Sequence, residues 1–337
     1  MRQLGRRAPL RALASGGLLL AVFASAAGSA EAKVTRYRSG NPADVRPTLF
    51  GPVHDLGGGG TDVDAALQCM IDEVRGCSDC ATTVDVVILR ASGADGYNAS
   101  ILAMNGVDSV ESLVITSSRD SNRAEVRATV ENAEVVFFAG GDQCDYVRNF
   151  KGTLVEAAVE SVYARGGGVG GTSAGLAILG EIAFDACHDT VTSAEALANP
   201  YDRRLSFTYD LFRFRDLVGT LTDTHFVRRD RLGRLLTFLA RQIQDGRAGR
   251  VLGVAVNDET SLVVDSHGLG RVLGAGPVYF ILADHLPEVC RPQTPLTYTG
   301  FKVWKVPAGR SFDLRVRPET GFTLLSVTGG AVGPNPY

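Results

Sequence analysis

The sequence predicts an α/β fold, in which one three-layer, doubly wound and mostly parallel sheet is extended by an antiparallel addition at the carboxyl end. From Pro52 onward, short runs rich in β-branched residues alternate with segments whose apolar residues recur at helical spacing. Glycine-rich stretches follow several of these runs. Because parallel strands end at a common edge, those stretches would meet at one rim, where such folds bind their ligands.

The first half of the chain contains the regular alternation. The strands that it predicts are Val53 to Leu56, Val84 to Leu89, Val110 to Thr116 and Ala133 to Phe138. The helices that it predicts are Asp62 to Val74, Asn98 to Met104, Asn122 to Val130 and Thr153 to Arg165. Each strand is followed by a helix, and this order is typical of a parallel sheet with helices on both faces.

The second half is less regular. Residues 231–244 form one apolar helical face and predict a helix docked on the core. Short strands follow at residues 250–256, 261–265, 271–273, 278–283, 299–305 and 311–316. Because no linker separates the two halves, we expect a single α/β domain over residues 52–337, preceded by an irregular lead-in at 33–51.

The N-terminus has the pattern of a signal peptide at residues 1–32. Arginines precede a short apolar run, and Ala30-Glu-Ala32 offers the small residues of a cleavage site. We therefore expect export, with cleavage near Ala32 and a periplasmic or extracellular location, and no later stretch predicts a membrane span. The formal net charge of −3 is poorly suited to nucleic acid.

All six cysteines lie beyond the predicted signal peptide. In an oxidising compartment an even number favours disulfide bonds, whose pairing the sequence does not specify. Cys69, Cys77 and Cys80 offer zinc as an alternative, but a fourth ligand at the usual spacing is missing, so the sequence favours disulfides.

The stretch Gly171-Thr-Ser-Ala-Gly175 matches the G-x-S-x-G pattern of a nucleophile elbow. It falls between a predicted strand and a helix, where flanking glycines allow the backbone to turn sharply and expose the serine. A nucleophilic serine needs a histidine as base and a carboxylate to orient it. Of the five histidines, His188 and His225 are the plausible bases. No dinucleotide or P-loop motif is present, so we expect no nucleotide cofactor.

Three blocks resemble the signature blocks of cyanophycinase and its relatives: Phe137-Phe-Ala-Gly-Gly-Asp-Gln143, Gly171-Thr-Ser-Ala-Gly175 and Asp223-Thr-His-Phe-x-x-Arg-x-Arg-x-x-Arg234. That family comprises serine peptidases related to dipeptidase E, on a flavodoxin-like sheet similar to class I glutamine amidotransferases. A more diffuse likeness extends to Gly253-Val-Ala-Val-Asn-Asp-Glu-Thr-Ser-Leu-Val-Val264.

The resemblance implies roles for individual residues. Ser173 would be the nucleophile and His225 the base, and the backbone N–H groups of Gly141 and Ala174 would form the oxyanion hole. Gln143 matches a substrate-contacting glutamine. The third member of the triad is left open among three acids that lie between the serine and the histidine. We favour Glu195, at an ordered helix start, over Asp185 and Asp189.

The remaining matches concern the substrate. Arg229, Arg231 and Arg234 match arginines that line the substrate groove, and Asp223 matches a carboxylate that receives a guanidinium. Thr224 replaces a glutamine that is common in the family. Cyanophycin is a poly-aspartate with arginine on each β-carboxyl group, so its recognition calls for charges of both signs.

The leading hypothesis is an exported serine exopeptidase that releases β-aspartyl-arginine dipeptides from cyanophycin through an acyl-enzyme, without metal or other cofactor. One alternative is a peptidase for other aspartyl or isoaspartyl peptides. Another is a secreted binding protein that has lost the chemistry. Relatives are often dimers, so a homodimer is a further possibility.

Overall fold

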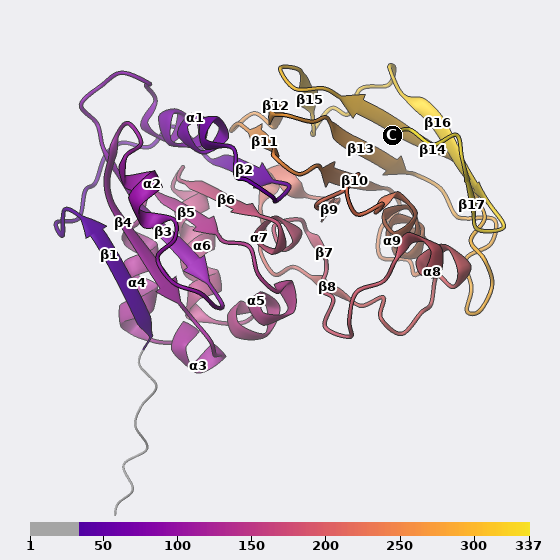
Figure 1. Cartoon of the computed structure of the whole chain (residues 1–337), viewed down its shortest axis with the longest axis horizontal. Coiled ribbons are helices and arrows are strands. Elements are labelled where there is room, and N and C mark those ends of the chain that lie inside the picture. The colour runs from indigo at the N-terminus through magenta and orange to yellow at the C-terminus, as the bar shows by residue number, and fades with distance from the viewer. Residues whose placement is uncertain (1–33) are drawn as a thin grey trace, which may run out of the picture. The chain divides into compact units, whose positions relative to one another are not determined.

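Two β-sheets organise residues 34–337, the part of the chain that the computed structural model describes (Figure 1). The predicted signal peptide lies outside the described residues. In spatial order, the first sheet contains β1 (Thr35–Gly40), β4 (Val107–Val114), β3 (Val84–Arg90), β5 (Val135–Phe138), β6 (Gly168–Thr172), β2 (Val53–Gly57), β11 (Thr260–Val264), β12 (Leu269–Gly274) and β15 (Ser311–Asp313). The second contains β17 (Ala331–Gly333), β16 (Thr323–Thr328), β14 (Tyr298–Val306), β13 (Val278–Ala283), β10 (Val251–Val256), β9 (Thr220–Asp223), β7 (Ile182–Phe184) and β8 (Phe207–Tyr209).

The helices of the described chain are α1 (Asp64–Arg75), α2 (Asn98–Leu102), α3 (Ser118–Ser121), α4 (Ala124–Asn132), α5 (Gln143–Phe150), α6 (Leu154–Ala164), α7 (Ala174–Ala177), α8 (Ser193–Ala198) and α9 (Leu232–Gln244), with a 3₁₀ turn, η1, at Arg215–Leu217. The alternation of strands and helices predicted for the first half is confirmed. The mixed α/β class is therefore correct.

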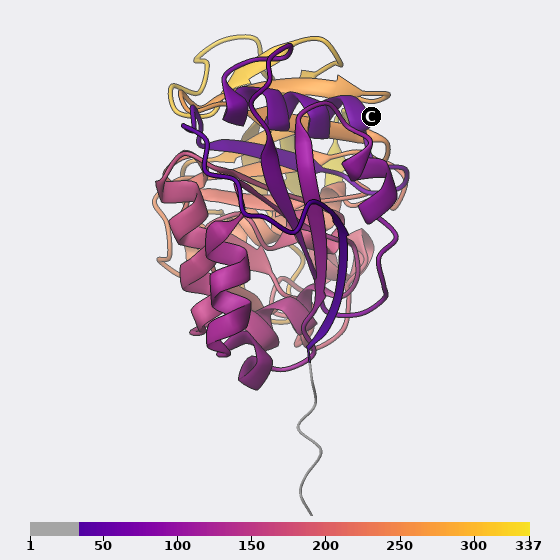
Figure 2. The same ribbon diagram turned by 90° about the vertical axis from the view of Figure 1, so that its left-hand side faces the viewer.

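The parallel part of the first sheet runs in the order β4, β3, β5, β6, β2. Successive residues of a strand face opposite sides, and β3 shows the result. Val86 and Ile88 pack in the same cluster as α1 and α2, whereas Val87 and Leu89 pack with α4 and α6. Burial on both faces explains why β3 is almost wholly apolar. In Figure 2 the magenta helices lie to one side of the indigo and purple strands.

The second sheet is mixed. Strands β7, β9 and β10 are parallel to one another, and the others pair in an antiparallel way. Helix α9 packs closely on it at Gly253 of β10, where a Cβ atom would lie only 3.1 Å from side-chain carbons of Leu235 and Leu239. A glycine in this strand thus lets the helix approach the sheet.

Three features differ from the expectations. Residues 35–40, in the predicted irregular lead-in, form the edge strand β1, which pairs antiparallel with β4. Its residues are all exposed or half-buried, so it lacks the apolar run of an interior strand. The C-terminal strands do not simply extend one sheet, because only β11, β12 and β15 join the first sheet, whereas the others belong to a second one. Strands β7, β8, β9, β16 and β17 were not predicted either. Within residues 34–337, no helix has the length and apolar character of a membrane span.

Candidate active site

Ser173 occupies a sharp turn between β6 and α7. Its backbone has φ 53° and ψ −117°, an unusual conformation for a residue with a side chain. The neighbouring glycines make the turn possible. A Cβ on Gly171 would lie 2.7 Å from the carbonyl carbon of Gly175, and one on Gly175 would lie 2.2 Å from the carbonyl oxygen of Phe138. This is the strand-turn-helix geometry of a nucleophile elbow.

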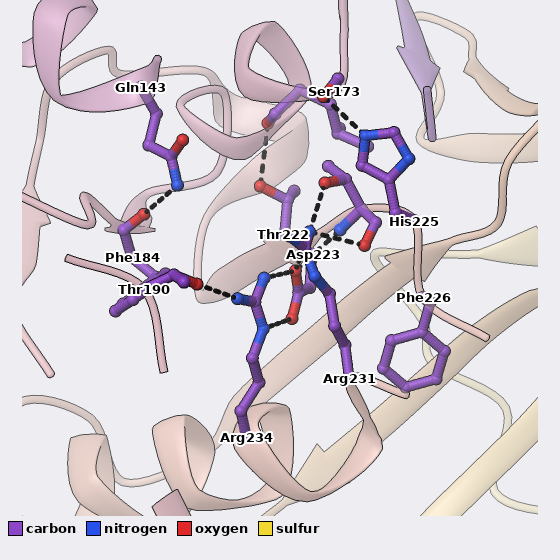
Figure 3. Close-up of polar contacts among 12 residues, drawn as sticks. Gln143, Ser173, Phe184, Thr190, Thr222, Asp223, His225, Phe226, Arg231 and Arg234 are labelled. Carbon is purple, nitrogen blue, oxygen red and sulfur yellow. Dashed lines mark hydrogen bonds and ion pairs between the residues drawn. The ribbon is translucent and has the colours of Figure 1, made fainter. Parts of the chain in front are cut away.

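His225 lies two residues beyond the end of β9 and reaches Ser173 from the second sheet (Figure 3). The Nε2 atom of His225 lies 2.8 Å from the Oγ atom of Ser173. The backbone N–H of His225 donates to the carbonyl oxygen of Gly58 at 2.9 Å. A Cβ on Gly59 would lie 2.3 Å from the imidazole Cε1, so only glycine fits beside the ring. The glycine-rich loop after β2 therefore holds the histidine in place.

The carboxylate at the other imidazole nitrogen belongs to Asp258. Its Oδ1 atom accepts a hydrogen bond from Nδ1 of His225, and its Oδ2 atom pairs with Arg228 at 2.8 Å. Asp258 lies in the turn between β10 and β11. Ser173, His225 and Asp258 thus form a continuous hydrogen-bonded chain of the kind found in serine hydrolases.

The expectation that Glu195 completes this chain is not met, and Asp258 takes the place. Glu195 is the third residue of α8, where its carboxylate accepts from the Thr192 backbone and pairs with Arg204 at 3.0 Å. Asp185 and Asp189 do not reach His225 either. Asp185 binds hydroxyl groups of β8 and its preceding loop, and Asp189 accepts from the next residue in the chain. The signal for Asp258 was present in the diffuse block of residues 253–264.

The surroundings of His225 suit it to act as a base. Burial lowers its pKa, the hydrogen bond to Asp258 opposes that change, and the positive charges of Arg229 and Arg231 reinforce it. The imidazole is therefore neutral near pH 7 and able to accept a proton. For Asp258, burial disfavours ionisation, but the hydrogen bonds from Arg228 and His225 outweigh it and lower the pKa. Asp258 is accordingly ionised at neutral pH.

A small pocket of about 60 Å³ opens beside Ser173 and contains both expected oxyanion-hole residues, Gly141 and Ala174, in its lining. Ala174 is the first residue of α7, so its N–H has no partner within the helix. The preceding glycine, Gly140, would place a Cβ 3.6 Å from the Cβ of Ser173. A glycine turn and a helix N-terminus thus meet at the serine, where their N–H groups suit a developing negative charge.

The pocket has an arginine-rich wall, to which Arg229, Arg231 and Arg234 all contribute. Arg234 makes a two-pronged ion pair with Asp223, with a 2.9 Å bond from Nε to Oδ2, and both side chains are 4% exposed. Arg231 donates to the carbonyl and hydroxyl oxygens of Thr224, at 2.9 and 2.8 Å. Burial lowers the pKa of Arg231 to about 10, so it keeps its charge at neutral pH.

These contacts change the expected role of Asp223. Its carboxylate is already bound by Arg234, with Arg231 3.4 Å away, and is not free for a substrate guanidinium. Arg229 is exposed and, within residues 34–337, makes no ion pair. The pocket therefore presents a net positive wall, which favours carboxylate groups.

Gln143 reaches the same pocket from the first sheet. It begins α5, and its Nε2 atom lies 3.5 Å from the carbonyl oxygen of Phe184 at the end of β7. The next residue, Cys144, forms a disulfide with Cys187, which follows β7. Helix α5 and the end of β7 are thereby joined covalently at the wall of the pocket.

A second disulfide joins Cys77 and Cys80, so the prediction of disulfides is confirmed for two pairs. It also removes these two thiols from the suggested zinc site. Cys69 and Cys290 are free. Within the described chain, no group of three or more His, Cys, Asp or Glu side chains is arranged to hold a metal ion.

Comparison with known proteins supports the reading of the three sequence blocks. No family model matches the chain. The chain is 27% identical to the cyanophycinase of Trichormus variabilis and 26% identical to that of a Nostoc species, in both cases over 221 residues that make up 63% of this chain and 67% of the relative. A cyanophycinase of Synechococcus elongatus is 28% identical over 177 residues, or 52% of this chain and 50% of the relative.

Among solved structures, a peptidase from an acI-B1 actinobacterium matches with a TM-score of 0.51 and 15% sequence identity, over 79% of this chain and 98% of that protein. At this low identity the structural match indicates a shared fold only. The type of enzyme is indicated by the sequence relatives. These relatives support a cyanophycinase-like peptidase, and hence a hydrolase.

Proposed function

We propose that the protein is an exported serine exopeptidase that hydrolyses cyanophycin to β-aspartyl-arginine dipeptides. The observation that carries the proposal is the hydrogen-bonded chain of Ser173, His225 and Asp258 beside the arginine-lined pocket. The likeness to the curated cyanophycinases supports the choice of substrate.

In the proposed reaction, His225 takes the hydroxyl proton as the Oγ atom of Ser173 attacks the carbonyl carbon of an aspartyl peptide bond. The N–H groups of Gly141 and Ala174 stabilise the oxyanion. The C–N bond then breaks, and His225 gives its proton to the leaving amine. A water molecule, deprotonated by His225, attacks the resulting ester and regenerates the serine. Throughout, Asp258 stabilises the imidazolium.

The charge of the pocket fits the end of this polymer. A terminal β-aspartyl-arginine unit carries two α-carboxylates, one on each amino acid. Arg229 and Arg231 offer guanidinium groups to them, whereas Arg234 is held by Asp223 and stabilises the wall. Arginine is well suited to this role because its planar fork binds a carboxylate through two parallel hydrogen bonds.

The test compares the protein from Lys33 onward with its Ser173→Ala variant on insoluble cyanophycin, with soluble products identified by mass spectrometry. We expect β-aspartyl-arginine from the wild type and none from the variant. Labelling by a fluorophosphonate, which reads the nucleophile alone, is the control for an active serine. If the serine is labelled but no soluble product is released from cyanophycin, cyanophycin is not the substrate. A panel of isoaspartyl dipeptides would then show which peptides the enzyme cleaves. Absence of both would favour a binding protein.

Export is part of the proposal, and two disulfides within residues 34–337 support it because such bonds persist in oxidising compartments. The N-terminal sequence of the protein recovered from periplasm and medium tests it. Cleavage is expected after Ala32. The homodimer stays a prediction, which light scattering in solution would test.

A further inference from the structure

A second cavity, of about 350 Å³, lies next to the active site but contains none of the triad residues. It is lined by the glycine-rich loop at residues 57–60, the start of α1, helix α2 and the carboxyl ends of β5 and β6. The role proposed above for the protein leaves this cavity unused. Its size is in the range of small-molecule sites.

The charged side chains of its wall are all acidic. Asp55, Asp62 and Asp64 contribute carboxylates, and no Lys, Arg or His is among the residues that line the cavity in the described chain. The Oδ2 atom of Asp62 accepts a hydrogen bond from the hydroxyl of Tyr97 at 2.6 Å. A cation would therefore meet several acceptors and no positive charge in the wall itself.

Asp55 lies deepest of these acids. Asp55 belongs to β2 and is 4% exposed. Its Oδ1 atom accepts a hydrogen bond from the hydroxyl of Ser261. Burial raises the pKa of Asp55 to about 7; the bond from Ser261 opposes this rise, and the negative charge of Asp62 adds to it. A buried carboxyl of this kind is incompletely compensated in the unliganded protein, and a bound cation would supply the missing charge.

A buried hydroxyl points to a ligand independently of the acids. Thr172, at the end of β6, is 4% exposed and lines the cavity, and its Oγ1 atom has no hydrogen-bond partner within residues 34–337. Its register partner on β2 is Gly57. A Cβ at Gly57 would lie 3.2 Å from this oxygen, so the glycine leaves the hydroxyl uncovered. Buried polar groups are normally paired, and a ligand would provide the partner.

The wall also has apolar members, of which Leu67, Ile101 and Phe137 are buried. A cavity that combines carboxylates with apolar side chains matches a cationic head on a hydrocarbon stem. We propose that the cavity binds a guanidinium or ammonium group carried on a short alkyl chain, with Asp55 and Asp62 as carboxylate acceptors and Thr172 as a hydroxyl acceptor.

The loop at residues 57–60 connects this site with the triad. The carbonyl oxygen of Gly57 accepts from the N–H of Ser173 at 3.0 Å, and that of Gly58 accepts from the N–H of His225 at 2.9 Å. One side of the loop thus supports the catalytic residues while the same segment lines the cavity. The cation could come from a basic side chain of the substrate or from a free basic molecule. Only the first source rests on the proposed function.

Calorimetry on the Ser173→Ala protein tests the site without turnover. The probe is Nα-acetyl-L-arginine amide, and Nα-acetyl-L-citrulline amide is its neutral counterpart of nearly equal shape. We expect the arginine probe to bind at least about tenfold more tightly, because a hydrogen bond to a charged group contributes this much or more. Asp62→Asn should weaken its binding by about tenfold. Asp62 is only half-buried, so this change leaves the core intact.

Two further variants locate the probe. Ser100→Trp keeps every charge but fills the cavity from the exposed surface of α2, and it should abolish binding. Asp142→Asn removes an exposed acid beside the other pocket, keeps a residue able to cap α5, and should leave binding unchanged. Equal affinity for the two probes, no binding, or equal losses from Asp142→Asn and Asp62→Asn would overturn the proposal.

Kinetics with cyanophycin distinguish the two sources once binding is established. If the polymer supplies the cation, Asp62→Asn raises KM and leaves kcat nearly unchanged. If a free molecule supplies it, KM is unchanged while the binding of the arginine probe is still lost. A protein without cyanophycinase activity would leave the calorimetric result standing, so the failure of one proposal is visible separately from that of the other.

Discussion

Replacing Asp258 by alanine is the sharpest test of the triad. The substitution removes the acceptor at Nδ1 of His225 and also the partner of Arg228, but leaves Ser173 and its elbow in place. His225 then loses the group that fixes its tautomer and stabilises its protonated form. The expected defect is therefore in turnover rather than in substrate binding.

The size of the defect follows from the geometry. Removing the carboxylate of a comparable triad lowers kcat by about 10⁴- to 3 × 10⁴-fold. This corresponds to about 5.4 to 6.1 kcal/mol of transition-state stabilisation. The side chain of Asp258 is 14% exposed, so water partly replaces it and the lower end of the range is expected.

The assay measures kcat and KM for release of soluble product across pH, with Glu195→Ala as the matched control. Because the hydrogen bond to Asp258 raises the pKa of His225, its loss should also move the inflection of the pH profile to lower pH. Glu195 caps α8 at the surface, and its substitution should keep turnover within about twofold. Turnover of Asp258→Ala within tenfold of wild type, or an equal loss in Glu195→Ala, would refute the assignment of the acid.

Three further predictions concern stability. Arg234→Ala leaves the buried Asp223 with only the longer, 3.4 Å ion pair to Arg231, and it should lower the free energy of unfolding by about 3 kcal/mol in urea titrations; a loss below about 1 kcal/mol would show that the pair with Arg234 is not structural. Burial lowers the pKa of His54 to about 4, against about 6.5 when unfolded, so its contribution is present above pH 6.5 and is lost as pH falls. Relative to His54→Phe, the wild type should lose about 3 kcal/mol between pH 7 and pH 4, and parallel pH curves would contradict this. The disulfide Cys144–Cys187 spans 43 residues, and its replacement by two alanines should lower the free energy of unfolding by about 4 kcal/mol; thermal melting of the oxidised wild type and the variant measures it, and equal midpoints would disprove it.

The sequence predicted that Ser173 and His225 act together because their local surroundings are distinctive, and the structure places their side chains 2.8 Å apart. An elbow needs glycine on both sides of the serine, and His225 stands in a recognisable block. The first parallel strands were also predictable, since each repeats a buried run followed by an amphipathic helix. In these cases the determinants of structure lie within a few residues of one another.

The acid of the triad depends on contacts between distant parts of the chain. Thr192-Ser-Ala-Glu195 predicts an ordered helix start. That order exists because the carboxylate of Glu195 takes part in the capping box with Thr192, so it is not free to bind His225. Asp258 lies in a turn between strands that belong to different sheets. Hydrophobic periodicity specifies a strand but not its neighbour, so neither the second sheet nor this contact could be derived from local patterns.

The disulfide between Cys144 and Cys187 has a consequence for when the enzyme becomes competent. Gln143 enters the substrate pocket from one sheet and Phe184 from the other, and the bond holds these two walls together. Glutathione and thioredoxin keep such thiols reduced in the cytosol. If the chain is exported as proposed, the Cys144–Cys187 bond forms only after the chain has left the cytosol, and the two walls of the pocket are covalently joined only from that point on.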